Sequence, residues 1–208
     1  MRFRRLQQIV GHGNFQILSF DDGLKVARRY SQVGEFSKAE IRFMEMLFYA
    51  EAERYGFLGQ KPLNKLTDRI KVKEAIKVPH TGNYLYRGRP LETFQKIKQH
   101  VGEKVVLTSG IRGIMKQFLL FLSKANKNHG NLSIASRSLA PPGYSFHGNG
   151  DFDVGQAGFG AANFTERFAD TDVYKKLGEL GYLKLRYPKE NLVGVRFEPW
   201  HIKVSADI

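Results

Sequence analysis

The sequence contains no cysteine, which excludes disulfide bonds, cysteine-ligated zinc sites and thiol catalysis. It also has no run of about 18 apolar residues, so no membrane-spanning helix is expected. The first ten residues begin with basic side chains but have no apolar core of the kind that a signal peptide needs. Three alternatives stay open: an export signal removed from the chain, export by another route, or action in the cytoplasm.

Acidic residues are few relative to basic ones. The 33 Lys and Arg against 20 Asp and Glu give a net charge of +13, which favours an anionic partner such as nucleic acid, a membrane surface or the cell wall. The basic residues are spread along the chain, and neither a basic helix nor a nucleic-acid motif is found, so nucleic acid is not the expected partner. A basic nucleic-acid binder remains an alternative, which a salt-sensitive DNA shift that survives chelation would support.

The hydrophobic content is sufficient for a folded core, since 42% of the 208 residues are hydrophobic and 16 are Phe. A capping box at Ser37 and Glu40, followed by apolar residues at helical spacing, predicts a helix over 37–55 that ends at Gly56. Further helices are expected over 91–101, 114–126 and 172–180. Strands are expected over 15–20, 24–30, 104–108, 181–187 and 193–204, the last two as a hairpin.

Two stretches, 145–153 and 197–201, carry residues suited to chemistry. Together they supply two histidines, two aspartates and one glutamate. Zinc binds imidazole nitrogen and carboxylate oxygen, and a catalytic zinc has three protein ligands and an open position for water. A further carboxylate has to take the proton from that water. These residue types therefore favour a zinc hydrolase.

The pattern Ser-x-His-x-x-Gly-x-x-Asp, followed by Glu-Pro-Trp-His, resembles the VanY-type D-alanyl-D-alanine carboxypeptidases. Members of that family are zinc peptidases that cut the peptide stems of peptidoglycan. The resemblance implies that His147, Asp153 and His201 bind one zinc ion and that Glu198 is the catalytic base. It covers roughly residues 90 to 204.

A third block, Thr108 to Gly113 with Gln117 downstream, resembles the family's Ser-Gly-Tyr-Arg segment. The resemblance implies that Arg112 faces the substrate, where it would pair with a terminal carboxylate or with the developing oxyanion. Gln117 and Ser145 are expected to line the cleft as hydrogen-bonding groups.

The chain departs from the family pattern at Ile111, where Tyr is usual, and at Asp151, where a small residue is usual. Asp151 is a second carboxylate two residues before the expected ligand, and the spacing favours Asp153. Asp151 is either a partner that orients a ligand histidine or a solvated carboxylate in a loop.

Glu198 and His201 are three residues apart, and on a straight strand they would face opposite sides of the sheet. Pro199 lies between them and favours an edge or a bulge, so we predict a local irregularity that turns both side chains into one cleft. The single tryptophan, Trp200, is expected to be a packing anchor that holds the backbone of His201.

The expected fold is α+β, a small, mostly antiparallel sheet with flanking helices, as the resemblance to Hedgehog/DD-peptidase-like proteins implies. Residues 1–90 are expected to be an N-terminal extension packed on a zinc peptidase core over 91–208, in one monomeric compact unit. The expected activity is that of a D,D-carboxypeptidase on peptidoglycan peptides in the periplasm or cell wall. An L,D-carboxypeptidase, an endopeptidase and a non-catalytic cell-wall binding module are the alternatives.

Overall fold

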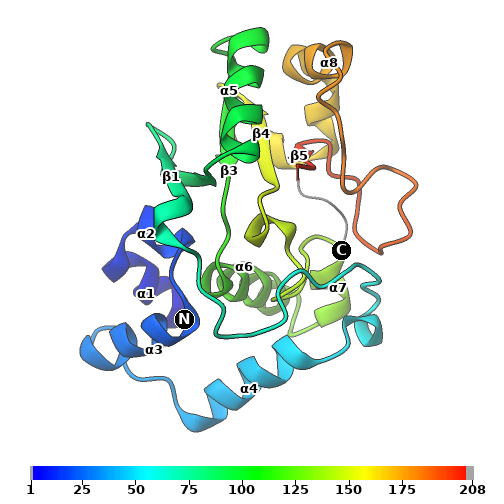
Figure 1. The fold of residues 1–208 in the computed structure, drawn as a ribbon. Helices are drawn as coiled ribbons and strands as arrows, with labels where there is room; N and C mark the ends of the chain where they lie inside the picture. Colours follow the sequence, from blue (N-terminus) through cyan, green and yellow to red (C-terminus); the bar gives the residue numbers. More distant parts are fainter. Residues whose placement is uncertain (1, 205–208) are drawn as a thin grey trace.

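The computed structural model describes residues 2–204 and confirms the α+β class: helices surround two small antiparallel sheets. Figure 1 shows a helical layer, α1 to α4 with α6 and α7, below a smaller part that contains the main sheet, α5 and α8. Within the described residues, no helix is both long and apolar enough to span a bilayer.

The N-terminal segment is helical, which corrects the expectation of strands over 15–20 and 24–30. It forms α1 (Arg2–Val10), α2 (His12–Gln16) and α3 (Phe20–Arg29). Asp21 and Asp22 lie in the first turn of α3, where Ser19 Oγ accepts a hydrogen bond from the Asp22 amide. Acidic residues in this first turn and Arg28 and Arg29 in the last complement the helix dipole.

The predicted capping box is confirmed at the start of α4 (Lys38–Tyr49). Ser37 Oγ accepts from the Glu40 amide at 3.2 Å, and the Glu40 carboxylate accepts from the Ser37 amide at 2.8 Å. The helix ends at Tyr49, before the predicted residue 55, and a short 3-10 helix, η1 (Ala52–Tyr55), follows it. Gly56 then adopts the left-handed conformation, with φ of 82°, as predicted.

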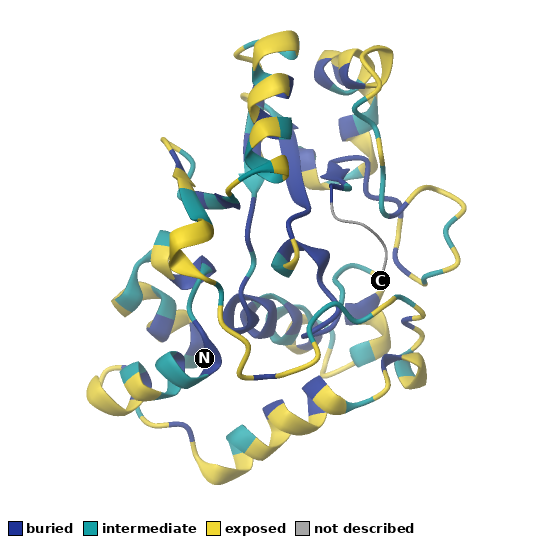
Figure 2. Ribbon diagram, viewed as in Figure 1, coloured by how far each residue is buried: buried dark blue, intermediate teal, exposed yellow. Residues whose placement is uncertain are grey.

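Helix α6 (Ile114–Lys127) is the centre of the larger hydrophobic core. Its Phe118 ring contacts Phe3 of α1 and Phe20 of α3, with centroids 6.1 and 6.3 Å apart. Residues of α4 and of the short α7 (Leu132–Ser136) join the same core, and Figure 2 shows α6 largely buried. The N-terminal helices therefore pack against the element that follows the Arg112 segment. The division at residue 90 remains a prediction.

The main sheet has the order β3-β4-β5, from β3 (Val105–Ser109), β4 (Phe152–Gln156) and β5 (His201–Ile202). Its register aligns Ser109 with Asp153, and Asp153 with His201. A second hydrophobic core joins this sheet to α5 (Arg89–Val101) and α8 (Asp172–Glu179). A separate hairpin, β1 (Ala75–Val78) with β2 (Asn83–Tyr86), lies beside β3. Four further 3-10 turns complete the secondary structure: η2 (Val72–Glu74), η3 (Phe146–Gly148), η4 (Gly160–Phe164) and η5 (Glu166–Asp170).

The hairpin expected from 181–187 and 193–204 is wrong. Ile202 of the two-residue strand β5 pairs with β4, and a single bridge to Leu185 is what remains of the expected pairing. Positive φ angles of 73° at Gly181 and 85° at Gly194 turn the chain away from an extended path. Trp200, Ile202 and Val204 are instead part of the core around the main sheet. Tyr187 and Val195 join a third, smaller core with Phe57.

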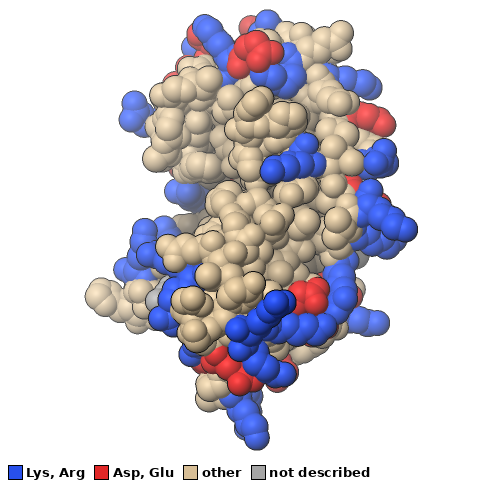
Figure 3. All heavy atoms as spheres, turned by 90° about the vertical axis from the view of Figure 1, so that its left-hand side faces the viewer, with Lys and Arg blue, Asp and Glu red and all other residues tan. Residues whose placement is uncertain are grey.

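Lys and Arg side chains are spread over the surface, in agreement with their spread along the sequence. On the face drawn in Figure 3 they extend over most of its height, interspersed with Asp and Glu near the upper and lower ends.

Candidate metal centre and its cavity

Three buried side chains from separate segments converge at the edge of the main sheet. His147 comes from η3, Asp153 from β4 and His201 from β5, and their possible ligand atoms all lie within 4.8 Å of one another. Asp153 Oδ1 lies 3.2 Å from His147 Nε2 and 3.3 Å from His201 Nδ1. The structure thus brings together the three ligands named from the sequence.

The far nitrogen of each histidine ring is held by an acceptor. His147 Nδ1 donates to the Gly110 carbonyl at 2.8 Å, and His201 Nε2 donates to Asp151 Oδ2 at 3.0 Å. These bonds fix the rings so that His147 Nε2 and His201 Nδ1 face Asp153. Metal-binding histidines are oriented in the same way, by a carbonyl or a carboxylate on the other nitrogen.

Asp151 is fully buried, which settles the alternative left open above: it is a partner of His201 and not a solvated loop carboxylate. Its Oδ2 also accepts from Arg186 Nε at 2.7 Å, and its Oδ1 accepts from the Val204 amide at 2.9 Å. Asp151 therefore ties the ring of His201 to the C-terminal segment.

The cluster fits a divalent metal ion. Asp153 Oδ1 is buried and has no hydrogen-bond partner among the described residues, although two ring nitrogens face it. Burial and the Arg112 charge lower the pKa of His147, so its lone pair is available. Burial opposes the charge on His201, but its hydrogen bond to Asp151 and the negative charge of Asp153 raise its pKa to about 9. These carboxylates attract a cation to this point, and a metal ion would replace the ring proton. Two imidazoles and a carboxylate are a donor set that zinc accepts.

The irregularity predicted at Pro199 is confirmed. A turn over Pro199 and Trp200 is closed by the His201 amide, which donates to the Glu198 carbonyl at 3.1 Å. It places Glu198 Oε2 3.7 Å from His201 Nδ1, on the same side of the chain. Trp200 is buried in the core and its carbonyl accepts from the Val154 amide at 3.0 Å, so it anchors the turn as expected.

Glu198 has the protonation behaviour of an acid–base group. Burial raises the pKa of its carboxyl to about 7, with Asp153 adding to the rise and His201 opposing it. A carboxyl that titrates near neutral pH can both take and return a proton.

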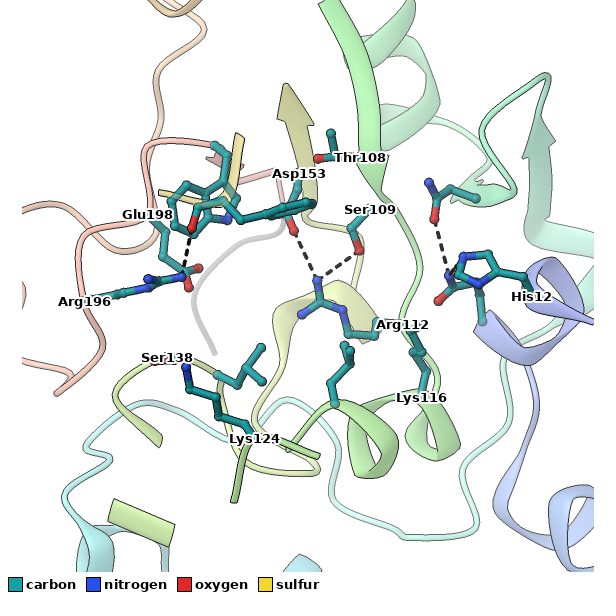
Figure 4. Close-up of a pocket in the computed structure, with 16 residues that line it drawn as sticks. His12, Thr108, Ser109, Arg112, Lys116, Lys124, Ser138, Asp153, Arg196 and Glu198 are labelled. Carbon is teal, nitrogen blue, oxygen red and sulfur yellow. Dashed lines mark hydrogen bonds and ion pairs between the residues drawn. The ribbon is translucent and has the colours of Figure 1, made fainter. Parts of the chain in front are cut away.

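A cavity of about 380 Å³ opens beside the cluster, and Glu198 and Asp153 line one side of it. Arg112 lies in its middle, where Nη2 donates to Asp153 Oδ2 at 3.1 Å and to Ser109 Oγ at 3.0 Å (Figure 4). The buried Arg112 Nε has no partner among the described residues. Arg112 thus faces the cavity and also supports Asp153, and its contact with a substrate remains a prediction.

Gln117 and Ser145 are close to this site but are not among the described residues that line the cavity. The Gln117 side chain donates to the Arg112 carbonyl and accepts from the Gly143 amide, both at 2.8 Å. It therefore holds the Arg112 backbone against the loop that leads to His147. Contacts of Gln117 and Ser145 with a substrate remain predictions.

Sequence reasoning missed the wall of the cavity opposite Glu198. His12 and Gln16 of α2, Asn83 of β2 and Lys116 of α6 form it. His12 begins α2 and is not part of the metal cluster. The available signal was Lys116, a charged residue within the run of apolar residues that α6 buries.

Comparison with known proteins agrees with this geometry. The model of the family described as VanY, D-alanyl-D-alanine carboxypeptidase, matches residues 88–206. This range contains the metal cluster, Glu198 and Arg112. A search of curated proteins gives no match.

Several solved structures share the fold. A mutant of the vancomycin-resistance D,D-pentapeptidase VanY, in complex with Zn(II), is 20% identical with a TM-score of 0.52, and the match covers 72% of this chain and 88% of that one. VanYB in complex with D-alanine-D-alanine is 23% identical with a TM-score of 0.53, over 73% of this chain and 86% of that one. The D,D-dipeptidase VanXYg with a D-Ala-D-Ala phosphinate analogue is 20% identical with a TM-score of 0.54, over 72% and 62% of the two chains.

Proposed function

The chain belongs to the VanY D-alanyl-D-alanine carboxypeptidase family, and we propose that it is a zinc peptidase that removes the terminal D-Ala from peptidoglycan stem peptides. The observation that carries the proposal is the buried Asp153 Oδ1, which lacks a hydrogen bond among the described residues and lies between two oriented histidine nitrogens, with a separate carboxyl, Glu198, beside them. Similar folds bind Zn(II) and D-Ala-D-Ala, which supports both the metal and the substrate.

His147, Asp153 and His201 would hold the metal. When bound, zinc would polarise the scissile carbonyl and acidify the attacking water. Glu198 takes the proton of that water as the new C–O bond forms, then delivers it to the amine nitrogen as the C–N bond breaks. Its pKa of about 7 suits both transfers. Arg112 contributes positive charge in the middle of the cavity, where the carbonyl oxygen becomes negative.

The alternatives differ in the bond cleaved. An L,D-carboxypeptidase or an endopeptidase would use the same residues with a different arrangement of the peptide in the cavity. A non-catalytic wall-binding module is disfavoured because it has no need of a buried carboxyl whose pKa lies near 7. Since the substrate is peptidoglycan, we propose that the protein acts outside the cytoplasm, in the periplasm or cell wall.

The test is mass spectrometry of purified muropeptides incubated with the protein and zinc, with a chelator and Glu198→Gln as controls. Loss of one terminal alanine from pentapeptides, abolished by both controls, is the expected result. Shortened tetrapeptides would support the L,D reading, and split dimers the endopeptidase. Unchanged muropeptides with zinc bound would contradict the peptidase and leave the binding module.

A further inference from the structure

Lys116 is a buried residue that lines the cavity, and its ammonium has no counterion among residues 2–204. Its side chain is 9% exposed and lines the cavity, yet the ammonium makes no hydrogen bond or ion pair with any described residue. A lysine in such a position is ordinarily paired, because burying an isolated charge is costly. Burial and the nearby charge of Arg112 lower the pKa of Lys116 to about 8. An anion bound in the cavity would offset both the cost of burying the Lys116 charge and its repulsion by Arg112.

A second unsatisfied group lies on the same wall. Gln16 is 3% exposed, and its Oε1 is a buried acceptor with no partner among the described residues. Its Nε2 is hydrogen-bonded to His12 Nε2 at 3.3 Å and donates to Asn83 Oδ1 at 3.4 Å. The Gln16 carbonyl accepts from the Gly113 amide at 2.7 Å, which fixes α2 to the start of α6. The wall is thus held in place, with one cation and one acceptor left for a ligand.

The position of this wall suits the end of a peptide. A terminal carboxylate lies one residue beyond the scissile bond, and one residue spans at most about 3.6 Å, so the carboxylate's partner has to lie near Arg112. Figure 4 shows Lys116 and His12 on the side of Arg112 away from Glu198 and Arg196. Arg196 on that other side already donates to the Phe164 carbonyl at 3.0 Å.

We propose that Lys116 and Gln16 form the subsite for the C-terminal residue of the substrate. The Lys116 ammonium pairs with its carboxylate, Gln16 Oε1 accepts a peptide N–H beside it, and Arg112 is left for the oxyanion. This inference rests on the proposed function and adds a specificity determinant from α2, which lies outside the matched range 88–206.

The experiment compares two N-acylated peptides that end in D-Ala-D-Ala, one with a free carboxylate and one with a C-terminal amide. Lys116→Met keeps the length of the side chain and removes its charge. We expect kcat/KM for the free acid to fall roughly 10- to 100-fold, as for the loss of a charge-assisted hydrogen bond, and the amide to change by less than about twofold. Lys116→Arg should restore part of the preference, and Lys127→Met, an exposed position on the same helix, should match the wild type.

The melting temperature of Lys116→Met should stay equal or rise, because a buried unpaired charge is removed. An equal loss for both peptides would reduce Lys116 to a structural role and overturn the inference. A wild-type preference for the acid that disappears in Arg112→Lys but persists in Lys116→Met would assign the carboxylate to Arg112 and overturn it as well.

A binding measurement distinguishes failure of this inference from failure of the proposed function. Calorimetry with the zinc-loaded Glu198→Gln protein measures the Kd of each peptide without turnover. If the wild type cleaves neither peptide, the proposed function fails, and acid-selective binding that is lost in Glu198→Gln/Lys116→Met still supports the carboxylate subsite. Equal binding of acid and amide, or no binding of either, overturns it.

Discussion

The two walls of the cavity are built differently. On the metal side, Asp151 accepts from a histidine, an arginine and a main-chain amide, and the far nitrogen of each ring is held. On the opposite side, neither the Gln16 Oε1 acceptor nor the Lys116 ammonium has a partner among the residues that the structure describes. The first wall is organised for an ion that occupies a fixed position. The second leaves polar groups free for a ligand that enters and leaves, so changes on the two sides should affect different quantities.

The largest effect is expected for Glu198→Gln. Removing the general base should lower kcat by roughly 10²- to 10⁴-fold, because the other carboxyl that lines the cavity within the described residues, Asp153, belongs to the metal cluster. Zinc content, measured on the same preparation, should match the wild type. Loss of zinc together with activity would mean that Glu198 belongs to the metal cluster rather than beside it.

Asp151→Asn tests how far the metal wall depends on the orientation of His201. An amide cannot replace the charge that holds both the His201 ring and Arg186, so zinc affinity should fall roughly 10- to 100-fold. A competition titration with a chromogenic chelator measures this, and Asp170→Asn, on a 3-10 turn away from the cluster, is a suitable control. An unchanged affinity would show that the ring is held without Asp151.

The metal side of the cavity could be predicted from the sequence because its residues lie close together along the chain. His147 and Asp153 are six residues apart, and Glu198 and His201 are three apart across a proline, so a short loop and a turn decide their geometry. Pairing of β4 with β5 then aligns Asp153 with His201, a contact between distant segments that the family resemblance, and not the spacing, made foreseeable.

The opposite wall could not be predicted in this way. Gln16 and Lys116 are 100 positions apart, and each belongs to a helix whose buried face gives no sign of a cavity. The segment around Gln16 was expected to be a strand, because the run 15–20 is mostly apolar and a short run of this kind does not distinguish a strand from a helix. Ser19 decides the outcome by capping α3, an effect of one hydrogen bond that the expected strand would lose.

Glu198 also predicts how the metal-free protein responds to pH. Its folded pKa of about 7 lies above its ordinary value of 4.5, so the fold favours the protonated carboxyl. That contribution is fully present below about pH 4.5 and is lost as the pH rises through 7. Glu198→Gln, which stays neutral, should therefore gain stability relative to the wild type between pH 5 and pH 8, by up to about 3 kcal/mol. Urea denaturation of both proteins in chelator measures the difference; a constant gap across this range would contradict the raised pKa.

The smallest effect is expected on the opposite wall, from His12→Ala. Its ring touches Gln7 and Gln16 at 3.1 and 3.3 Å, so its removal loosens the Gln16 amide, while the contact with Asn83 remains. We expect a two- to fivefold fall in kcat/KM, an order-of-magnitude estimate for the loss of one modest hydrogen bond. Zinc affinity, measured in the same titration as for Asp151→Asn, should not change, because within the described residues no hydrogen bond joins α2 to the metal cluster. A parallel loss of zinc would show that the two walls act as one unit. An unchanged affinity with a raised KM would place the substrate, and not the metal, against the N-terminal helices.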